Sequence, residues 1–267
     1  MCDYFGVSKS GFYSWKKRAK SKKIDRDNTL LREIKRVHRG QRKSYGSPRV
    51  YRALRKKGVV CSRRRVARLM QVNGIKASVV GLYSIRPNKH DIYQQADNVL
   101  GSADKPTRPN QQWVADFTYL KTGQGWYYFS MILDRYSRKL VGWSFSKDRN
   151  TEFTKSSLIM ALESEKPEDG LIFHTDQGIE YVSHKFQNKL KEENLRPSMS
   201  RRGRCLDNAM AESFFHTMKT EMFHHKKYKT MTSVKKDILS FIDFYNNERL
   251  HSYLGYMSPE EFIKKAA

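Results

Sequence analysis

The stretch from Gln112 to the C-terminus alternates between strand-like and helix-like segments, and this order restricts the possible folds more than any other feature. Three runs rich in aromatic and β-branched residues have the spacing of β-hairpins and predict antiparallel strands over 113–120, 126–133 and 140–146. The segments that follow are a helix over 151–163, a strand over 171–174, a helix from 183, a strand over 195–199, and helices over 208–221 and 233–247. Such an order is typical of a mixed α/β fold, with helices flanking a five-stranded sheet.

The first hundred residues have the pattern of short, capped helices. Ser47 and Pro48 form a strong helix start, and Gly58 is a natural stop. Ser62 begins a further helix that Gly74 ends. The two predicted helices span 48–57 and 63–73. Their short connecting turn contains a glycine, so the sequence predicts a small all-α helix-turn-helix region.

The second of these helices carries four arginines in front of aliphatic residues: Arg63, Arg64, Arg65 and Arg68. Long cationic side chains on a helix that is packed from behind suit entry into a DNA groove. We therefore predict that these arginines bind DNA. The alternative is a solvated basic helix in a small bundle.

Lys and Arg outnumber Asp and Glu by 52 to 27, and the sequence pI is about 10.0. Residues 1–110 hold 28 basic and 7 acidic side chains, whereas residues 111–267 hold 24 and 20. This imbalance predicts a polyanionic partner, most commonly DNA or RNA, held mainly by the first part of the chain. A basic protein that is merely soluble, or that binds membrane surfaces, is the alternative.

The cysteines Cys2, Cys61 and Cys205 are odd in number and lack metal-ligand spacing. They indicate a reducing compartment and no disulfide framework. No apolar run approaches the ~20 residues of a membrane helix, and the N-terminus has no secretory signal. We expect a cytoplasmic protein, associated with the nucleoid when it is bound to DNA, and no membrane partner.

Three carboxylates lie on segments predicted to be rigid: Asp116 within a strand, Asp176 just after a buried strand, and Glu212 on a helix. Asp116 has aromatic and aliphatic neighbours, so it must pair, accept hydrogen bonds or bind a metal ion. Asp176 follows the carboxyl end of its strand, where ligands gather in α/β sheets, although a turn or cap aspartate is the alternative. Glu212 shares a polar helix face with Lys219, which also fits a surface ion-pair stripe. Together, three hard oxygen ligands can hold two divalent ions for phosphoryl transfer on nucleic acid.

Further polar residues surround these acids in the sequence. Arg201, Arg202 and Arg204 form a basic, glycine-containing loop suited to a DNA backbone, and Lys219 lies where it could face a phosphate. Asn208 belongs to the start signal of the helix that carries Glu212, and we expect it to support the carboxylates from behind. His174 is either a similar supporting group or a satisfied core histidine.

Seven segments of the chain resemble the second-reading-frame protein of the insertion-sequence-three family of transposases, which has a retroviral-integrase-like catalytic core. The helix-turn-helix part of that family is similar to YGSPRVYRALR and SRRRVARLM. Its catalytic core is similar to WVADFTYL, MILDRYSRKLVGW, FHTDQGIEY and SRRGRCLDNAMAESFFHTMKTE, and its C-terminal signature to YNNERLHSYLGYMSPEEF. The resemblance implies a ribonuclease-H-like fold in which Asp116, Asp176 and Glu212 are the catalytic acids. It also implies two Mg²⁺ ions, with Mn²⁺ as a substitute.

The same resemblance implies a domain order and an activity. We expect a partial helix-turn-helix over 1–24, a DNA-binding helix-turn-helix over 25–78, a linker over 79–108, and an integrase catalytic core with a C-terminal helix over 109–267. The implied activity is DNA transposition, in which strands are cut and then joined by attack of a DNA 3′-hydroxyl.

The implied partners are double-stranded DNA, as terminal inverted repeats and target, and further copies of the chain in a dimer or higher oligomer. An upstream-frame protein would join as a fusion or as a separate partner. Two alternatives are a ribonuclease-H-like nuclease without strand transfer and a non-catalytic DNA-binding regulator.

Overall fold

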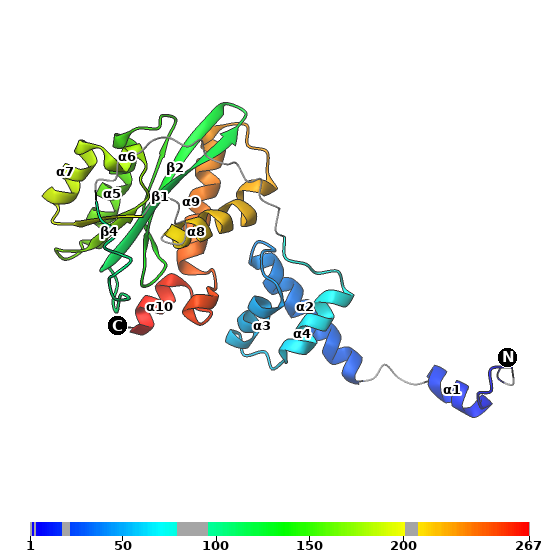
Figure 1. The fold of residues 1–267 in the computed structure, drawn as a ribbon. Coiled ribbons are helices and arrows are strands. Elements are labelled where there is room, and N and C mark those ends of the chain that lie inside the picture. The colour runs from blue at the N-terminus through cyan, green and yellow to red at the C-terminus, as the bar shows by residue number, and fades with distance from the viewer. Residues whose placement is uncertain (1, 3, 18–21, 79–95, 201–207, 267) are drawn as a thin grey trace. The chain divides into compact units, whose positions relative to one another are not determined.

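The computed structural model describes residues 2, 4–17, 22–78, 96–200 and 208–266, and the chain divides into two compact units, Met1–Ser78 and Val79–Ala267 (Figure 1). Much of the predicted linker, residues 79–95, lies outside the described residues. The segment that follows, from residue 96, belongs to the second unit and is hydrogen-bonded to the strands of its sheet. The Leu100 N–H donates to Ser198 Oγ at 2.9 Å, and Gln112 Nε2 donates to the Asp104 carbonyl at 2.7 Å.

The described part of the first unit is all-helical, as the sequence predicts. Its helices are α1 (Lys9–Lys17), α2 (Lys22–Gly40), α3 (Ser47–Lys56) and α4 (Arg63–Val72). Pro48 lies in the first turn of α3, and Gly58 takes a φ of +76° in the turn that leads toward α4. The Ser62 hydroxyl caps α4 by accepting from the Arg65 N–H at 3.3 Å. Helices α2, α3 and α4 enclose a small apolar core that includes Ile34, Val50, Leu54 and Val66.

The second unit is built on a mixed five-stranded sheet in the order β3-β2-β1-β4-β5. The strands are β1 (Gln112–Thr122), β2 (Gly125–Asp134), β3 (Leu140–Ser146), β4 (Ile172–Thr175) and β5 (Arg196–Met199). Strands β1, β2 and β3 form an antiparallel meander, whereas β4 runs parallel to β1 and β5 parallel to β4. The predicted mixed sheet is therefore confirmed.

Helices cover both faces of this sheet (Figure 1). One face is covered by α5 (Thr151–Glu165), α6 (Ile179–Val182) and α7 (His184–Glu192), and the other by α8 (Ala209–Glu221) and α9 (Met231–Asn247). The 3₁₀ turns Phe223–His225 and Ser252–Leu254 and helix α10 (Pro259–Ala266) complete the unit. Among the helices described here, none is long and apolar enough to cross a membrane.

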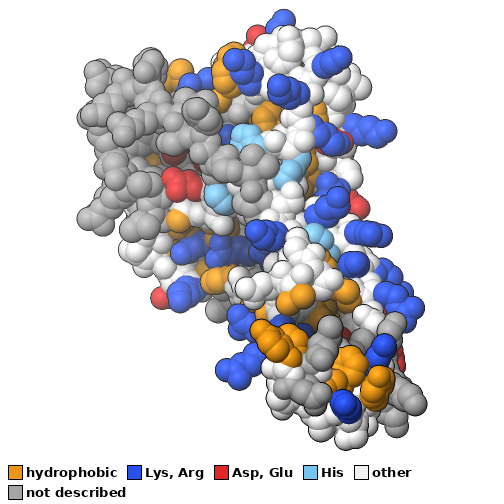
Figure 2. All heavy atoms as spheres, turned by 90° about the vertical axis from the view of Figure 1, so that its right-hand side faces the viewer, with side chains coloured by type: hydrophobic (Ala, Val, Ile, Leu, Met, Phe, Trp, Pro, Cys, Tyr) orange, Lys and Arg blue, Asp and Glu red, His pale blue; other side chains and the backbone are white. Residues whose placement is uncertain are grey.

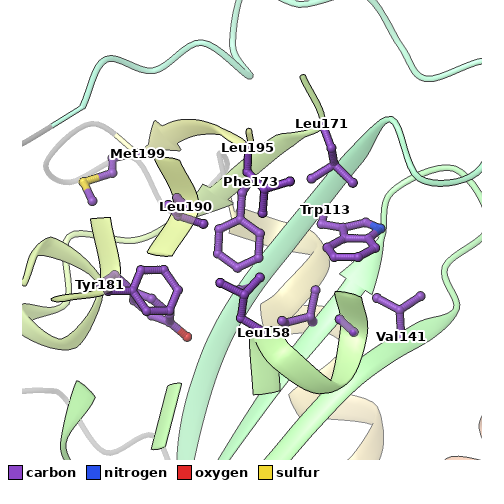
Figure 3. Packing of buried hydrophobic residues seen from close by; sticks show 13 residues of the cluster. Trp113, Val141, Leu158, Leu171, Phe173, Tyr181, Leu190, Leu195 and Met199 are labelled. Carbon is purple, nitrogen blue, oxygen red and sulfur yellow. The ribbon is translucent and has the colours of Figure 1, made fainter. Parts of the chain in front are cut away.

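The main core lies between the sheet and α5, α6 and α7 (Figure 3). Trp113 from β1, Phe173 from β4, Leu158 from α5 and Tyr181 from α6 meet there, each almost fully buried. Because side chains alternate along a strand, Trp113 and Ala115 enter this core while Asp116 points to the α8 side. Packing of the odd-numbered positions thus fixes which way the carboxylate faces.

The C-terminal segment closes the β3 edge of the sheet. The Asn246 carboxamide from α9 accepts from the Leu140 N–H at 2.9 Å and donates to the Leu140 carbonyl at 3.0 Å. Beyond α9, the Arg249 guanidinium makes a buried bidentate pair with the Glu221 carboxylate, at 2.7 and 2.9 Å. The motif YNNERLHSYLGYMSPEEF therefore has a structural role in joining α8, α9 and β3.

The close approach of β3 and α5 yields a stability prediction. A Cβ atom at Gly142 would lie 2.4 Å from the Ser157 carbonyl oxygen and 2.7 Å from the Ala161 Cβ. We expect Gly142→Ala to lower the free energy of unfolding by about 3 kcal/mol, since overpacking next to backbone cannot relax easily. Thermal denaturation measures this loss. Gly40→Ala, where a Cβ would meet nothing within 4 Å, is the control and should not lower Tm.

Candidate active site

Asp116 and Asp176 are brought together by the parallel pairing of β1 and β4. Val114 pairs with His174 in this register, and each aspartate lies two residues beyond its strand's member of the pair. Each carboxylate is also fixed by a backbone N–H. Phe117 donates to Asp116 Oδ1 at 2.8 Å, and Gly178 donates to Asp176 Oδ1 at 3.0 Å. Adjacent strands thus present two half-buried carboxylates at the same level of the sheet.

Glu212 reaches this neighbourhood from α8, whose buried face packs on β1. Its side chain is exposed, yet its charge acts on the Asp116 carboxyl. Within the ranges that the structure describes, no three His, Cys, Asp or Glu side chains are close enough to hold a metal ion together. The structure therefore gives a closely placed pair of acids, with the third acid within electrostatic reach.

Burial and neighbouring negative charges disfavour the ionised forms of Asp116 and Asp176. Burial raises the pKa of Asp116 well above its usual range, and the charges of Asp176 and Glu212 raise it further. Burial also raises the pKa of Asp176, which the neighbouring Glu180 carboxylate reinforces. A cation between such oxygens would offset both effects, and carboxylate oxygens are the ligands that Mg²⁺ prefers. The two aspartates therefore fit as ligands of a divalent metal ion.

Lys219 lies beside the acids, as its helix position implies. Its Nζ donates to Thr118 Oγ1 at 2.6 Å and lies 5.5 Å from the centre of the Tyr119 ring. Burial lowers the pKa of Lys219, while the Asp116 carboxylate raises it in part. The ammonium group thus turns onto β1 next to the carboxylates.

His174 and Asn208 occupy different surroundings from those of the acids. The fully buried His174 ring contacts Ser198 Oγ through Nδ1 and Ser200 Oγ through Nε2, both at 2.9 Å. These contacts link β4 to the end of β5, which is how a satisfied core histidine behaves. Asn208 is buried at the start of α8, where its side chain makes no capping bond. Its Oδ1 has no hydrogen-bond partner in the described part of the chain.

The predicted basic loop begins next to Asp176. The Ser200 N–H donates to the Thr175 carbonyl at 2.9 Å, and Gln177 Nε2 donates to the Ser200 carbonyl at 3.0 Å. The loop arginines Arg201, Arg202 and Arg204 lie outside the described residues.

In the first unit, the four predicted arginines of α4 divide into two kinds. Arg65 Nε and Arg68 Nη2 each donate to the Asp27 carboxylate at 2.6 Å, so they tie α4 to α2. Arg63 and Arg64 are exposed and have no ion-pair partner among the described side chains. The face of the molecule drawn in Figure 2 carries many Lys and Arg side chains and few Asp and Glu side chains.

The sequence does not predict the ion pair that two residues form near the acids. Arg149, in the turn before α5, donates through Nε and Nη2 to the carboxylate of Glu180 on α6. They are 31 positions apart, and neither lies in a periodic pattern that would predict the pair.

The chain is similar to known proteins over almost its whole length. Residues 106–205 and 193–259 match integrase core domain families, and residues 25–81 match an HTH-like domain family. The chain is 36% identical to the insertion element IS600 uncharacterized 31 kDa protein of Shigella sonnei, over 99% of this chain and 98% of that protein. It is 34% identical to transposase InsF for insertion sequence IS3A of Escherichia coli strain K12, over 99% of this chain and 93% of that protein.

Among solved structures, the simian T-cell lymphotropic virus intasome in complex with PP2A regulatory subunit B56 gamma is similar in fold. The match has a TM-score of 0.53 and 14% identity, and it covers 86% of this chain and 74% of that chain. Together with the sheet order, this confirms the ribonuclease-H-like fold expected from the sequence.

The crowded carboxylates yield a prediction about stability. An aspartate whose pKa is raised on folding loses stability as pH rises from its unfolded value of about 3.9 through the raised folded value. We therefore expect Asp116→Asn to raise Tm at pH 7 in metal-free buffer, with roughly 2–4 °C for each kcal/mol in a unit of this size. The gain should vanish near pH 3. Equal Tm values at pH 7 would contradict the repulsion described above.

The arginines of α4 yield a second prediction. Arg64→Ala should reduce the slope of log K for DNA binding against log salt by about 0.9, the value for one phosphate contact, without changing Tm. Arg65→Ala should instead lower the Tm of the first unit, because Asp27 loses one of its two partners. Salt titrations and thermal denaturation of both variants separate the two roles. An unchanged slope for Arg64→Ala would remove that side chain from the phosphate contacts.

Proposed function

Because the chain belongs to the insertion-sequence-three family of transposases, a family of DNA-joining enzymes with an integrase core, we propose that Asp116, Asp176 and Glu212 are its catalytic acids. The observation that carries this assignment is the parallel register of β1 and β4, which sets two half-buried aspartates side by side under α8. The exposed Glu212 then completes the set from the side on which DNA would approach.

The three acids would hold two Mg²⁺ ions, and Mn²⁺ could replace them. The bound ions would supply an activated nucleophile and stabilisation of the leaving 3′-oxygen. Asp116, whose pKa the charges of Asp176 and Glu212 both raise, would hold the metal together with these two acids. Phe117 and Gly178 hold the aspartates in place through their N–H groups, so neither carboxylate has to reorganise on binding.

The remaining side chains position DNA. Lys219 places a positive charge beside Asp116, where a backbone phosphate would lie. The exposed arginines of α4 and the loop arginines Arg201, Arg202 and Arg204 would add phosphate contacts. No covalent protein–DNA intermediate is required, so we assign no Ser or Tyr nucleophile.

The proposed substrates are double-stranded DNA ends with terminal inverted repeats, together with target DNA. Two ends must meet for joining, so the working assembly is a dimer or higher oligomer on DNA. An upstream-frame protein would take part as a fusion or as a separate chain, and the reaction would take place in the cytoplasm.

The test is strand joining by the purified full chain with Mg²⁺ and DNA that carries the inverted repeats flanking its own gene. We expect cleavage and joining by the wild type and a loss of at least about 10³-fold in Asp116→Asn, Asp176→Asn and Glu212→Gln, since each removes a metal ligand. DNA binding by the three variants should persist. Cleavage without joining would favour a nuclease, and binding with neither would favour a regulator. Full activity of Asp116→Asn would overturn the assignment.

A further inference from the structure

An ion pair between a buried carboxylate and an exposed guanidinium lies beside Asp176, one of the proposed catalytic acids. Glu180 on α6 is 2% exposed, and both of its carboxylate oxygens accept from Arg149, one of them at 3.2 Å from Nη2. Arg149 itself is 39% exposed. A bidentate pair of this kind fixes the plane of the guanidinium, whereas an unpaired surface arginine samples many rotamers.

Gly178 lies between the carboxylates of Asp176 and Glu180, and it shows how close the ion pair is to the site. A Cβ atom at Gly178 would meet Asp176 Oδ1 at 3.0 Å and Glu180 Oε2 at 3.3 Å. The Arg149 guanidinium also lies 5.0 Å from the centre of the Phe117 ring, and Phe117 follows Asp116 in β1. Arg149 therefore lies beside Asp176, and its positive charge lowers the pKa of that carboxyl.

The pair occupies two of the three guanidinium nitrogens. Nε and Nη2 donate to Glu180, and Nη1 makes no hydrogen bond or ion pair within the described ranges of the chain. The exposure of the side chain leaves this nitrogen accessible to a ligand. A planar nitrogen donor, held rigidly beside the Asp176 carboxylate, suits an anionic oxygen that has to approach this carboxylate.

We propose that Arg149 binds a backbone phosphate of the DNA strand on which Asp116 and Asp176 act, and that Glu180 is the residue that positions it. This inference rests on the proposed function, which places the reacting strand at those aspartates. A strand that approaches two carboxylates meets repulsion, and a fixed cation at their border offsets it without closing the site. Glu180 holds Arg149 so that little conformational entropy is lost when the phosphate binds.

The alternative is that Arg149 only neutralises Glu180 inside the fold. Arg149→Gln alone does not separate the two roles, because it leaves a buried carboxylate unpaired and could unfold the unit. The decisive variant is therefore Arg149→Gln combined with Glu180→Gln, which removes both charges and keeps hydrogen-bonding groups. Glu180→Gln alone keeps the guanidinium. Arg108→Gln is the matched control, since Arg108 also pairs bidentately with a glutamate, Glu168, near the start of β4 rather than its end.

The measurements are the salt dependence of DNA binding and the rate of strand cleavage by the full chain with Mg²⁺, on the DNA used above. The double variant should reduce the slope of log K against log salt by about 0.9 and slow cleavage by roughly 10²-fold at saturating DNA. Arg108→Gln should change neither the slope nor the rate. Glu180→Gln should keep the slope and lose part of the rate.

Two results separate this inference from the proposed function. If Asp116→Asn abolishes cleavage while the folded double variant keeps the wild-type slope and rate, Arg149 has only a structural role and the inference is wrong. If Asp116→Asn cleaves normally, the catalytic assignment is wrong and the inference falls with it. Circular dichroism and Tm establish that each variant is folded before either comparison is made.

Discussion

The second unit depends on one register: β4 runs parallel to β1, with Val114 opposite His174. Backbone hydrogen bonds in this pairing force two acidic side chains to the same level, although their charges repel. A one-residue slip would turn Asp116 into the core that Trp113 and Ala115 fill. The packing that buries the aromatic face therefore also maintains the electrostatic strain of the site.

Groups from several elements offset the repulsion between Asp116 and Asp176. Backbone N–H groups of Phe117 and Gly178 stabilise the two aspartates, and Lys219 and Arg149 bring positive charge from α8 and from the turn before α5. Glycine at 178 leaves room for these groups, since a Cβ there would lie 3.0 Å from Asp176 Oδ1 and 3.3 Å from Glu180 Oε2. The fold thus balances the repulsion between the two aspartates with hydrogen bonds and positive charges from separate elements.

The sequence predicts the parts of this structure that local patterns control. The five strands, the paired helices of the first unit and the segments that carry the three acids follow from alternation, capping and spacing. The sequence alone allows two interpretations of His174, and its contacts with Ser198 and Ser200 are those of a satisfied core histidine.

Partners that are distant along the chain could not be predicted. The sequence predicts that Arg65 and Arg68 bind DNA, but it gives no sign that both also donate to Asp27 on another helix. The Arg149–Glu180 ion pair and the two hydrogen bonds between Asn246 and Leu140 are similar cases, because each depends on the tertiary structure. The C-terminal motif resembles a family signature, but its physical role depends on the contact of α9 with β3, which the sequence does not show.

The two hydrogen bonds between Asn246 and Leu140 affect how the edge of the sheet can meet other chains. β3 is an outer strand, and exposed outer strands offer unpaired backbone groups that recruit strands from other chains. Asn246 already satisfies both backbone groups of Leu140, where β3 begins. If copies of the chain assembled on neighbouring DNA ends, as proposed above, their local concentration would be high, and strand addition at an open edge would lead to aggregation. A single carboxamide thus protects the start of this edge against such strand addition.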